Sequence, residues 1–253
     1  MHVKIISKKE YPELSRLRKS FPSSSNPDIC IAVGGDGTFI RAAKEGKCPI
    51  LPIRADEKGS VGYHSDASLS DMDYVIKALK NGNYTVEKLA NMIELDYKGK
   101  KRYAVNEVRL NNMTEEVNFK VYLLEKGKRS LVYPYVMGGD GLIVTSLIGS
   151  TAYNKSAGGP LLLTPDVICI TFLNVDGPYC NPIVFDSSKV IEIEIAKYPG
   201  ILRYDNCNAG RLSKGNTFRV RLSNRSFDIV RLKGKREAFS DKLDRLIKSK
   251  MYK

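Results

Sequence analysis

The sequence has few histidines and no long apolar run, and both shortages exclude broad classes of protein. Only two of its 253 residues are histidine, His2 and His64, which argues against a histidine-rich metal centre and a histidine-based catalytic triad. We expect His64, in the loop at residues 62–66, to face solvent, with ligand contact as the alternative. No apolar run approaches the length of a membrane span, and the N-terminus lacks a signal-peptide core. We therefore expect a cytoplasmic protein.

Cysteine pairs of the disulfide or zinc-binding kind are also missing. The five cysteines are an odd number, widely spaced, and form no Cys-x-x-Cys motif. This usage predicts reduced thiols rather than a disulfide framework or a zinc site.

Positive charge is in excess, with 41 Lys and Arg residues against 28 Asp and Glu, a net charge of +13. The excess indicates anionic partners such as nucleotides, polyphosphate or nucleic acid. Its densest part, residues 225–236 and the C-terminus, lacks the interleaved aromatic residues of a single-strand binder. We favour a solvated basic face there, and nucleic acid is the less favoured partner.

The chain changes texture near residue 84. Before it, strand patterns at residues 3–6, 29–33 and 49–53 alternate with helix patterns at 11–19, 38–45 and from 69 onward. This order favours a parallel sheet whose ligand lies at the carboxyl ends of the strands.

After residue 84, short β-branched and aromatic runs separated by turn residues favour an antiparallel domain. The runs lie at 86–97, 103–110, 119–124, 131–136, 142–145, 167–172, 190–196, 218–222 and 229–232. A helical stripe at 236–248 follows. We predict an α/β domain at 1–84, a β-rich domain at 85–234 and a C-terminal helix at 235–253 that packs on the first domain.

The tetrapeptide Gly-Gly-Asp-Gly occurs twice, at residues 34–37 and 138–141, each time beside an apolar run. A strand, a glycine turn and a helix start form an anion site, because free backbone N–H groups point outward and glycine lets a phosphate approach. An aspartate among such amides repels phosphate, so it needs another task, such as accepting a proton or holding a metal ion. The pairing suggests phosphoryl transfer.

Further motifs follow in a specific order. They are Asn106-Glu107, the run at 139–144, Gly-Ser-Thr-Ala-Tyr at 149–153 and Ser-Ala-Gly-Gly-Pro at 156–160. With the first tetrapeptide, this order resembles NAD kinase over nearly the whole chain. The resemblance implies an N-terminal α/β domain, a β-rich, sandwich-like C-terminal domain and an active site between them. It also implies phosphate transfer from ATP, or polyphosphate in some members, to the 2′-hydroxyl of the adenosine ribose of NAD.

Asp36 is the catalytic candidate. A ribose hydroxyl is a poor nucleophile until its proton has an acceptor, and Asp36 at the tip of a strand–turn–helix can take that proton. Gly34, Gly35 and Gly37 would supply room and N–H groups for donor phosphates. The alternative is that Asp36 only caps the helix that follows. A Mg²⁺ ion bridging the donor phosphates is expected, although the sequence has no dedicated carboxylate cage and we assign no metal ligand.

Asn106 and Glu107 are the candidates for binding NAD, since an amide beside a carboxylate offers complementary donors and acceptors. The alternative is a strand-end polar pair facing water. By resemblance, the segment at 149–156 lines the dinucleotide pocket with Thr151, Ala152, Tyr153 and Ser156. Tyr153 offers a flat stacking surface, or else is a core tyrosine.

Three further residues are expected near the ligand on the resemblance alone. Tyr63 stands where the family has an aromatic residue, and Asp205 resembles another family aspartate near the site. Family members are commonly homo-oligomers, dimers or tetramers, in which the residue at Asp140 contributes to the neighbouring subunit's NAD site. A carboxylate at Asp140 that only fixes the turn is the alternative.

The sequence departs from the family pattern in three places. Leu147 and Ile148 stand where a proline and a small hydroxyl residue are usual. Residues 177–182 lack the family histidine, and the loop at 54–60 is longer and more charged than usual. These changes concern the contacts to NAD and the phosphate donor rather than Asp36.

Two other functions stay open. Another Gly-Gly-Asp-Gly kinase, acting on a sugar or lipid, would keep Asp36 without needing Asn106-Glu107 and the segment at 149–156. A non-catalytic nucleotide or nucleic-acid binding protein would rest on the basic charge, and would show salt-sensitive retention without turnover.

Overall fold

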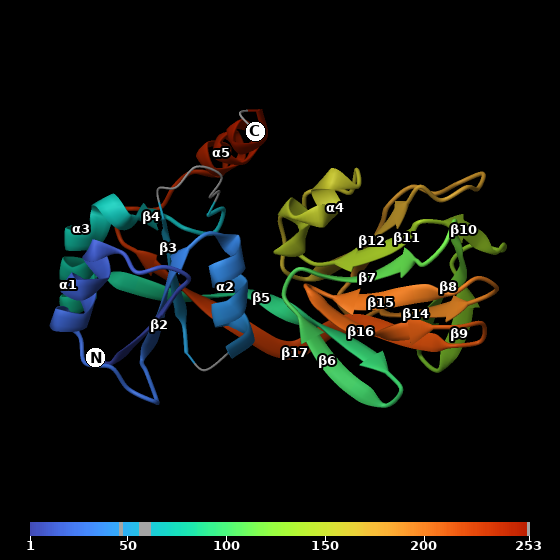
Figure 1. Ribbon diagram of the computed structural model, residues 1–253, viewed down its shortest axis with the longest axis horizontal. Coiled ribbons are helices and arrows are strands. Elements are labelled where there is room, and N and C mark those ends of the chain that lie inside the picture. The colour runs from blue at the N-terminus through green and yellow to red at the C-terminus, as the bar shows by residue number, and fades with distance from the viewer. Residues whose placement is uncertain (46–47, 56–61, 252–253) are drawn as a thin grey trace. The chain divides into compact units, whose positions relative to one another are not determined.

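The computed structural model describes residues 1–45, 48–55 and 62–251. The chain forms two compact units: residues 1–89 with 227–253, and residues 90–226. The strands β5 (Tyr84–Tyr97) and β17 (Thr217–Leu232) each continue from one unit into the other (Figure 1). An N-terminal α/β region followed by a β-rich region confirms the predicted fold class.

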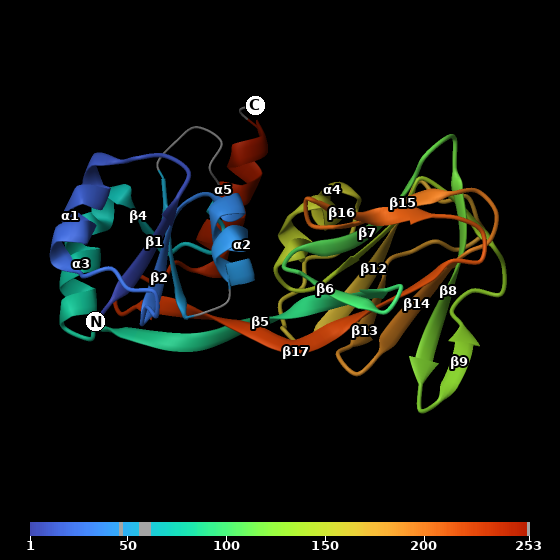
Figure 2. The ribbon, with the colours of Figure 1, turned by 60° about the horizontal axis from the view of Figure 1, so that its bottom comes forward.

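The first unit is built on a parallel sheet. Its strands are β1 (Val3–Ser7), β2 (Ile29–Gly34), β3 (Ile50–Arg54) and the short β4 (Ala67–Ser68), and the end of β17 also pairs with β3. The helices α1 (Pro12–Ser20) and α3 (Met72–Lys80) cover one face and α2 (Asp36–Glu45) covers the other (Figures 1 and 2). Leu14 and Leu17 of α1 are fully buried because they recur at helical spacing toward the sheet.

The connecting helices complete this unit. The 3₁₀ turn η1 (Leu69–Asp71) leads into α3, and α5 (Phe239–Met251) follows β17. Among the described helices, none combines the length and the apolar character that crossing a bilayer requires.

The second unit packs two antiparallel layers around one core. One sheet has the order β13 (Ile183–Asp186), β12 (Val167–Leu173), β11 (Gly141–Thr145), β7 (Glu107–Asn112), β15 (Gly200–Tyr204) and β16 (Cys207–Leu212). The other layer holds β6 (Lys100–Ala104), β8 (Val117–Glu125), β9 (Lys128–Leu131), β10 (Met137–Gly139), β14 (Val190–Ile195) and parts of β5 and β17. The turn η2 (Gly149–Thr151) and α4 (Tyr153–Ser156) lie between β11 and β12.

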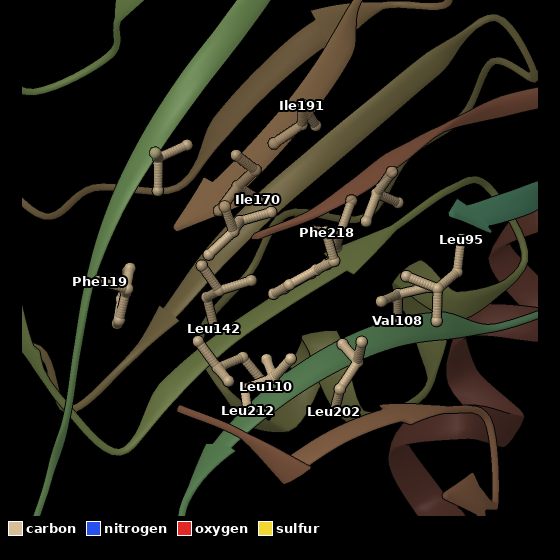
Figure 3. Packing of buried hydrophobic residues seen from close by; sticks show 14 of the residues in the cluster. Leu95, Val108, Leu110, Phe119, Leu142, Ile170, Ile191, Leu202, Leu212 and Phe218 are labelled. Atoms are coloured by element: carbon tan, nitrogen blue, oxygen red, sulfur yellow. The ribbon is translucent and has the colours of Figure 1, made fainter. Parts of the chain in front are cut away.

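Alternating side chains fill the space between these layers. Phe218 and Val220 of β17 are buried while their neighbours face solvent, the period of a half-buried strand. Phe119 and Phe172, from opposite layers, stack with ring centroids 6.5 Å apart. Figure 3 shows aliphatic residues of the same core, including Leu110, Leu142 and Ile191.

Several predicted boundaries were wrong. The predicted strand at 103–110 is two strands, β6 and β7. The chain breaks at residues 105–106 because their backbone N–H groups donate to the side chain of Asp205, about 100 residues away. The predicted strand at 131–136 lies mostly between β9 and β10, and the two runs at 218–222 and 229–232 belong to the single strand β17. The strands β13, β15 and β16 were not predicted, and α2 begins two residues earlier than expected.

All five cysteines carry free thiols, as the sequence predicted. The described part of the apolar stripe of the C-terminal helix is only partly buried. Of the apolar stripe predicted on the C-terminal helix, Leu243 is partly buried and Ile247 is exposed.

His64 is buried, so the prediction that it faces solvent was wrong. Its ring stacks on Phe39 of α2, with centroids 5.0 Å apart, and meets the Tyr63 ring edge-on at 5.2 Å. Burial, reinforced by the nearby cations Arg231 and Lys242, lowers the pKa of His64 to about 3. The imidazole is therefore neutral at neutral pH and belongs to the core that holds the 62–66 loop.

This burial predicts a pH-dependent stability. Below the ordinary histidine pKa of 6.5, the unfolded chain takes up a proton at His64 that the folded chain refuses until about pH 3, so the free energy of unfolding falls across that window. We expect His64 to account for about 2 kcal/mol of the loss between pH 7 and pH 5. Urea unfolding of His64→Phe at both pH values should show a correspondingly smaller loss. The exposed His2→Phe should keep the wild-type dependence, and an unchanged dependence in His64→Phe would contradict the argument.

Candidate functional site

The first group of predicted site residues lies where β2 passes into α2. Gly34 ends the strand with φ +150°, and a Cβ there would lie 2.5 Å from the Thr38 hydroxyl. A larger residue would therefore be strained and would clash, so the tight turn requires glycine. Asp36 is the first residue of α2 and is half-buried. Gly37 is exposed, and a Cβ on it would meet no atom within 4 Å.

The Asp36 carboxylate accepts a hydrogen bond from a second segment, the loop at 62–66. The backbone N–H of Tyr63 donates to Asp36 Oδ1 at 2.9 Å. Burial raises the pKa of Asp36, while this hydrogen bond and the charge of Arg245 act to lower it. Asp36 is thus a carboxylate of raised basicity at a helix start, the property a proton acceptor needs.

Basic side chains distant in sequence hold the 62–66 loop. Arg245 of α5 donates through Nη2 to the carbonyl oxygens of Gly62, at 2.9 Å, and Ser65, at 3.4 Å. The buried Asp66 carboxylate pairs with Arg231 of β17 and with Lys242 of α5. Sequence reasoning missed this role of Arg245, because 183 residues separate it from Gly62 and no local pattern marks it.

The second group lies in the other unit and centres on Asn106, which follows β6, and Glu107, the first residue of β7. The Asp205 carboxylate accepts the backbone N–H groups of Val105, Asn106 and Glu107 at 3.1, 2.8 and 3.3 Å. Asp205 itself is buried, at φ +46°. The structure therefore gives Asp205 the task of fixing the Asn106–Glu107 turn. Glu107 is buried and Asn106 half-buried.

The structure brings the segment at 149–156 against this turn. The Asn106 carbonyl accepts the Thr145 hydroxyl at 2.8 Å, and a Cβ on Gly149 would lie 1.8 Å from the same oxygen. Glycine at 149 is thus required for this close approach. Thr151 and Ala152 are half-buried, whereas Tyr153, 38% exposed, and Ser156 are accessible.

Two further residues support this segment and were missed. Asn154 is fully buried; its amide donates to the Pro160 carbonyl at 2.9 Å and its oxygen accepts the Thr171 hydroxyl at 2.6 Å. Arg109 of β7 lies with its guanidinium carbon 5.6 Å from the Tyr153 ring centroid. Asn154 lies next to Tyr153 in the motif, but only the fold shows it to be an anchor.

Asp140 is hydrogen-bonded to residues at the ends of the two neighbouring strands, β7 and β12. Its carboxylate accepts the side-chain amides of Asn112 at 2.9 Å and Asn174 at 2.6 Å. These are the contacts that the turn-fixing alternative requires. Contact with a neighbouring subunit stays a prediction.

The three departures from the family pattern have different surroundings. Ile148 is buried and its carbonyl accepts the Thr151 hydroxyl at 3.2 Å. The 177–182 segment is bonded by tyrosines, with the Tyr135 hydroxyl donating to the Tyr179 carbonyl at 2.7 Å. In the loop at 54–60, residues 56–60 lie outside the described part of the chain.

Within the described residues, no three His, Cys, Asp or Glu side chains gather as a metal site would require.

The contacts of Asp205 predict a large effect on stability. Asp205→Ala leaves three backbone N–H groups without their acceptor in a buried site, which we expect to lower the free energy of unfolding by about 3 kcal/mol. Asp205→Asn keeps one oxygen, so its loss should be clearly smaller. Urea denaturation of both variants measures this. Equal, small losses in both variants would contradict a supporting role for the carboxylate.

Comparison with known proteins connects the unit that holds the second group to one family. The family model for the ATP-NAD kinase C-terminal domain matches residues 81–232. The NAD kinase of Wigglesworthia glossinidia brevipalpis is 32% identical over 188 residues, 70% of this chain and 60% of that protein. The NAD kinase of Clostridium kluyveri is 33% identical over 184 residues, covering 69% and 62%. In both, the chain spans less than two thirds of the relative's length. The NAD kinase of Thermoplasma acidophilum is 28% identical over 235 residues, which cover 89% of this chain and 81% of that protein.

Solved structures show the same fold. An NAD kinase from Archaeoglobus fulgidus in complex with ATP superposes with a TM-score of 0.73 at 21% identity, covering 98% of this chain and 99% of that one. Yeast NADH kinase complexed with NADH superposes with a TM-score of 0.71 at 19% identity, covering 94% of this chain and 67% of that one. The match to residues 81–232, which contain the Asn106–Glu107 turn and the segment at 149–156, places this chain in the NAD kinase family.

Proposed function

We propose that this protein is an NAD kinase that transfers a phosphoryl group from ATP to the 2′-hydroxyl of the adenosine ribose of NAD, producing NADP. Family membership supports the reaction class, and the ATP bound to the Archaeoglobus fulgidus enzyme supports ATP as donor, with polyphosphate as the alternative. The observation that carries the proposal is Asp36, a half-buried carboxylate of raised pKa at the start of α2.

Asp36 accepts the proton of the attacking hydroxyl. Its raised pKa makes it a stronger base than an exposed aspartate, and the Tyr63 N–H fixes one carboxylate oxygen while the other stays available to the ribose. The backbone N–H groups of Asp36 and Gly37 precede the first helical hydrogen bond, from Thr38 to Gly35. They would receive the donor phosphates, with Gly34 and Gly35 keeping the approach free of side chains.

A divalent cation, Mg²⁺ by expectation, would enter with ATP as part of the donor. Bound to the donor phosphates, it would neutralise their charge. We assign no residue of the protein as a ligand of this cation.

Asn106 and Glu107 would bind NAD, and the accessible ring of Tyr153 would stack against it, with Thr151, Ala152 and Ser156 lining the same pocket. Tyr63 would contact the ligand beside Asp36. Asp205 would act by holding the Asn106–Glu107 turn. We also propose a homo-oligomer in which Asp140 reaches a neighbouring NAD site, and a cytoplasmic location, where NAD and ATP are both available.

The alternatives are not favoured. A sugar or lipid kinase would not need the Asn106–Glu107 turn and the segment at 149–156, which the matched family region contains. A non-catalytic binding protein would not need a carboxylate of raised pKa at the phosphate-binding turn.

The catalytic role of Asp36 predicts a specific defect. Asp36→Asn keeps the size of the side chain but removes the proton acceptor, so turnover should fall by at least ~100-fold with little change in the KM for NAD. NADP formation from NAD and Mg·ATP measures this. Asp73→Asn on the exposed face of α3 is the matched control and should retain wild-type turnover.

Two results would count against the proposal. Near-normal turnover by a folded Asp36→Asn protein would remove the role of the carboxylate. A wild-type protein that makes no NADP with either ATP or polyphosphate would remove the activity itself.

A further inference from the structure

Two arginines face each other on the six-stranded sheet of the second unit. Arg109 of β7 and Arg203 of β15 are directly paired in the antiparallel register. Their strand neighbours Val108, Leu110 and Leu202 are fully buried in the core between the layers (Figure 3). Because side chains alternate along a strand, both arginines project from the opposite face of the sheet, next to each other.

No described carboxylate forms an ion pair with either arginine. Arg109 and Arg203 are both half-buried, and the Arg109 Nε is fully buried with no hydrogen-bond partner among the described residues. On the other layer, by contrast, Arg219 binds Glu192 and Arg221 binds Glu94. Like charges directly opposite on a sheet destabilise it, and a buried guanidinium N–H without an acceptor adds to the cost.

The surroundings of the pair point to an anionic, partly aromatic ligand. The guanidinium of Arg109 lies 5.6 Å from the centre of the accessible Tyr153 ring. Glu107, two residues before Arg109 on β7, is on the same face and belongs to the turn assigned to NAD. The arginine pair therefore adjoins the residues proposed to bind the dinucleotide.

We propose that Arg109 and Arg203 form a binding site for a diphosphate group, which in the proposed function is the diphosphate bridge of NAD. Guanidinium groups match phosphate oxygens in charge and fork geometry, so one diphosphate satisfies both side chains and removes their mutual repulsion. The identity of the natural ligand rests on the proposed function. The diphosphate site itself rests on the register, the missing counter-ions and the buried N–H.

Inorganic pyrophosphate is the direct probe. Calorimetric titration of the full-length wild-type protein should show binding that weakens by at least ~10-fold in Arg109→Ala and in Arg203→Ala, since each removes a charge-assisted contact. Arg225→Ala is the matched control, because Arg225 also lies over a tyrosine ring, 4.0 Å from that of Tyr103, in the same unit. It should bind pyrophosphate as the wild type does.

Thermal stability separates a binding role from a structural one. Arg203→Glu places a carboxylate opposite Arg109, so its Tm should equal or exceed that of the wild type while pyrophosphate binding is lost. If Arg203→Glu and Arg203→Ala both lowered Tm, the pair would be structural and the proposal would be wrong. Unchanged pyrophosphate binding in both alanine variants, or a change in oligomeric mass without a change in binding, would also overturn it.

Steady-state kinetics connect the site to NAD. Each alanine variant should raise the KM for NAD by about 10-fold with kcat within about twofold of wild type, because the diphosphate is held equally before and during phosphoryl transfer. A third result is a wild type that makes no NADP while both alanine variants lose pyrophosphate binding. That result would support the diphosphate site and remove only the proposed activity. An unchanged KM for NAD in a catalytically active protein would remove the diphosphate bridge of NAD as the ligand.

Discussion

The hydrogen bond from the Tyr63 backbone to Asp36 is the contact on which the proposed chemistry depends. It fixes a half-buried carboxylate at the first turn of α2, and it can form only while the 62–66 loop stays in place. That loop is held by Arg245, by the Asp66 ion pairs and by the stacking of His64 on Phe39. Burial raises the basicity of Asp36, and the Tyr63 N–H with Arg245 keeps the charged form accessible.

Asp36 and Asp205 have different surroundings, and the difference explains their roles. Asp205 accepts three backbone N–H groups, so its oxygens are committed to the Asn106–Glu107 turn. Asp36 has one backbone donor, which leaves an oxygen for a substrate proton. The arginines of the second unit differ in the same way. Most arginines of the layer opposite β7 and β15 have carboxylate partners, whereas Arg109 and Arg203 have none among the described residues.

Local patterns were sufficient to predict the α/β unit, the turn at Gly34 and the position of Asp36, because glycines, an apolar strand and a helix start are adjacent in the sequence. They were insufficient wherever a distant side chain decides the backbone. The break between β6 and β7 depends on Asp205, about 100 residues away, and the burial of His64 depends on Phe39 and on cations of β17 and α5. The strands β15 and β16 carry glycine and polar residues, so their alternation is weak. Only the pairing of β15 with β7 and of β16 with β15 defines them.

The most direct test of the account is the pKa of the Asp36 carboxyl group in the folded protein, measured by NMR titration of aspartate-labelled protein beside the pH profile of kcat. We expect the pKa of Asp36 to lie above the ordinary aspartate value of 3.8 and to coincide with the acidic limb of the kcat profile. An Asp36 pKa at or below 3.8, or an acidic limb unrelated to its titration, would contradict the claim that this carboxylate takes the proton.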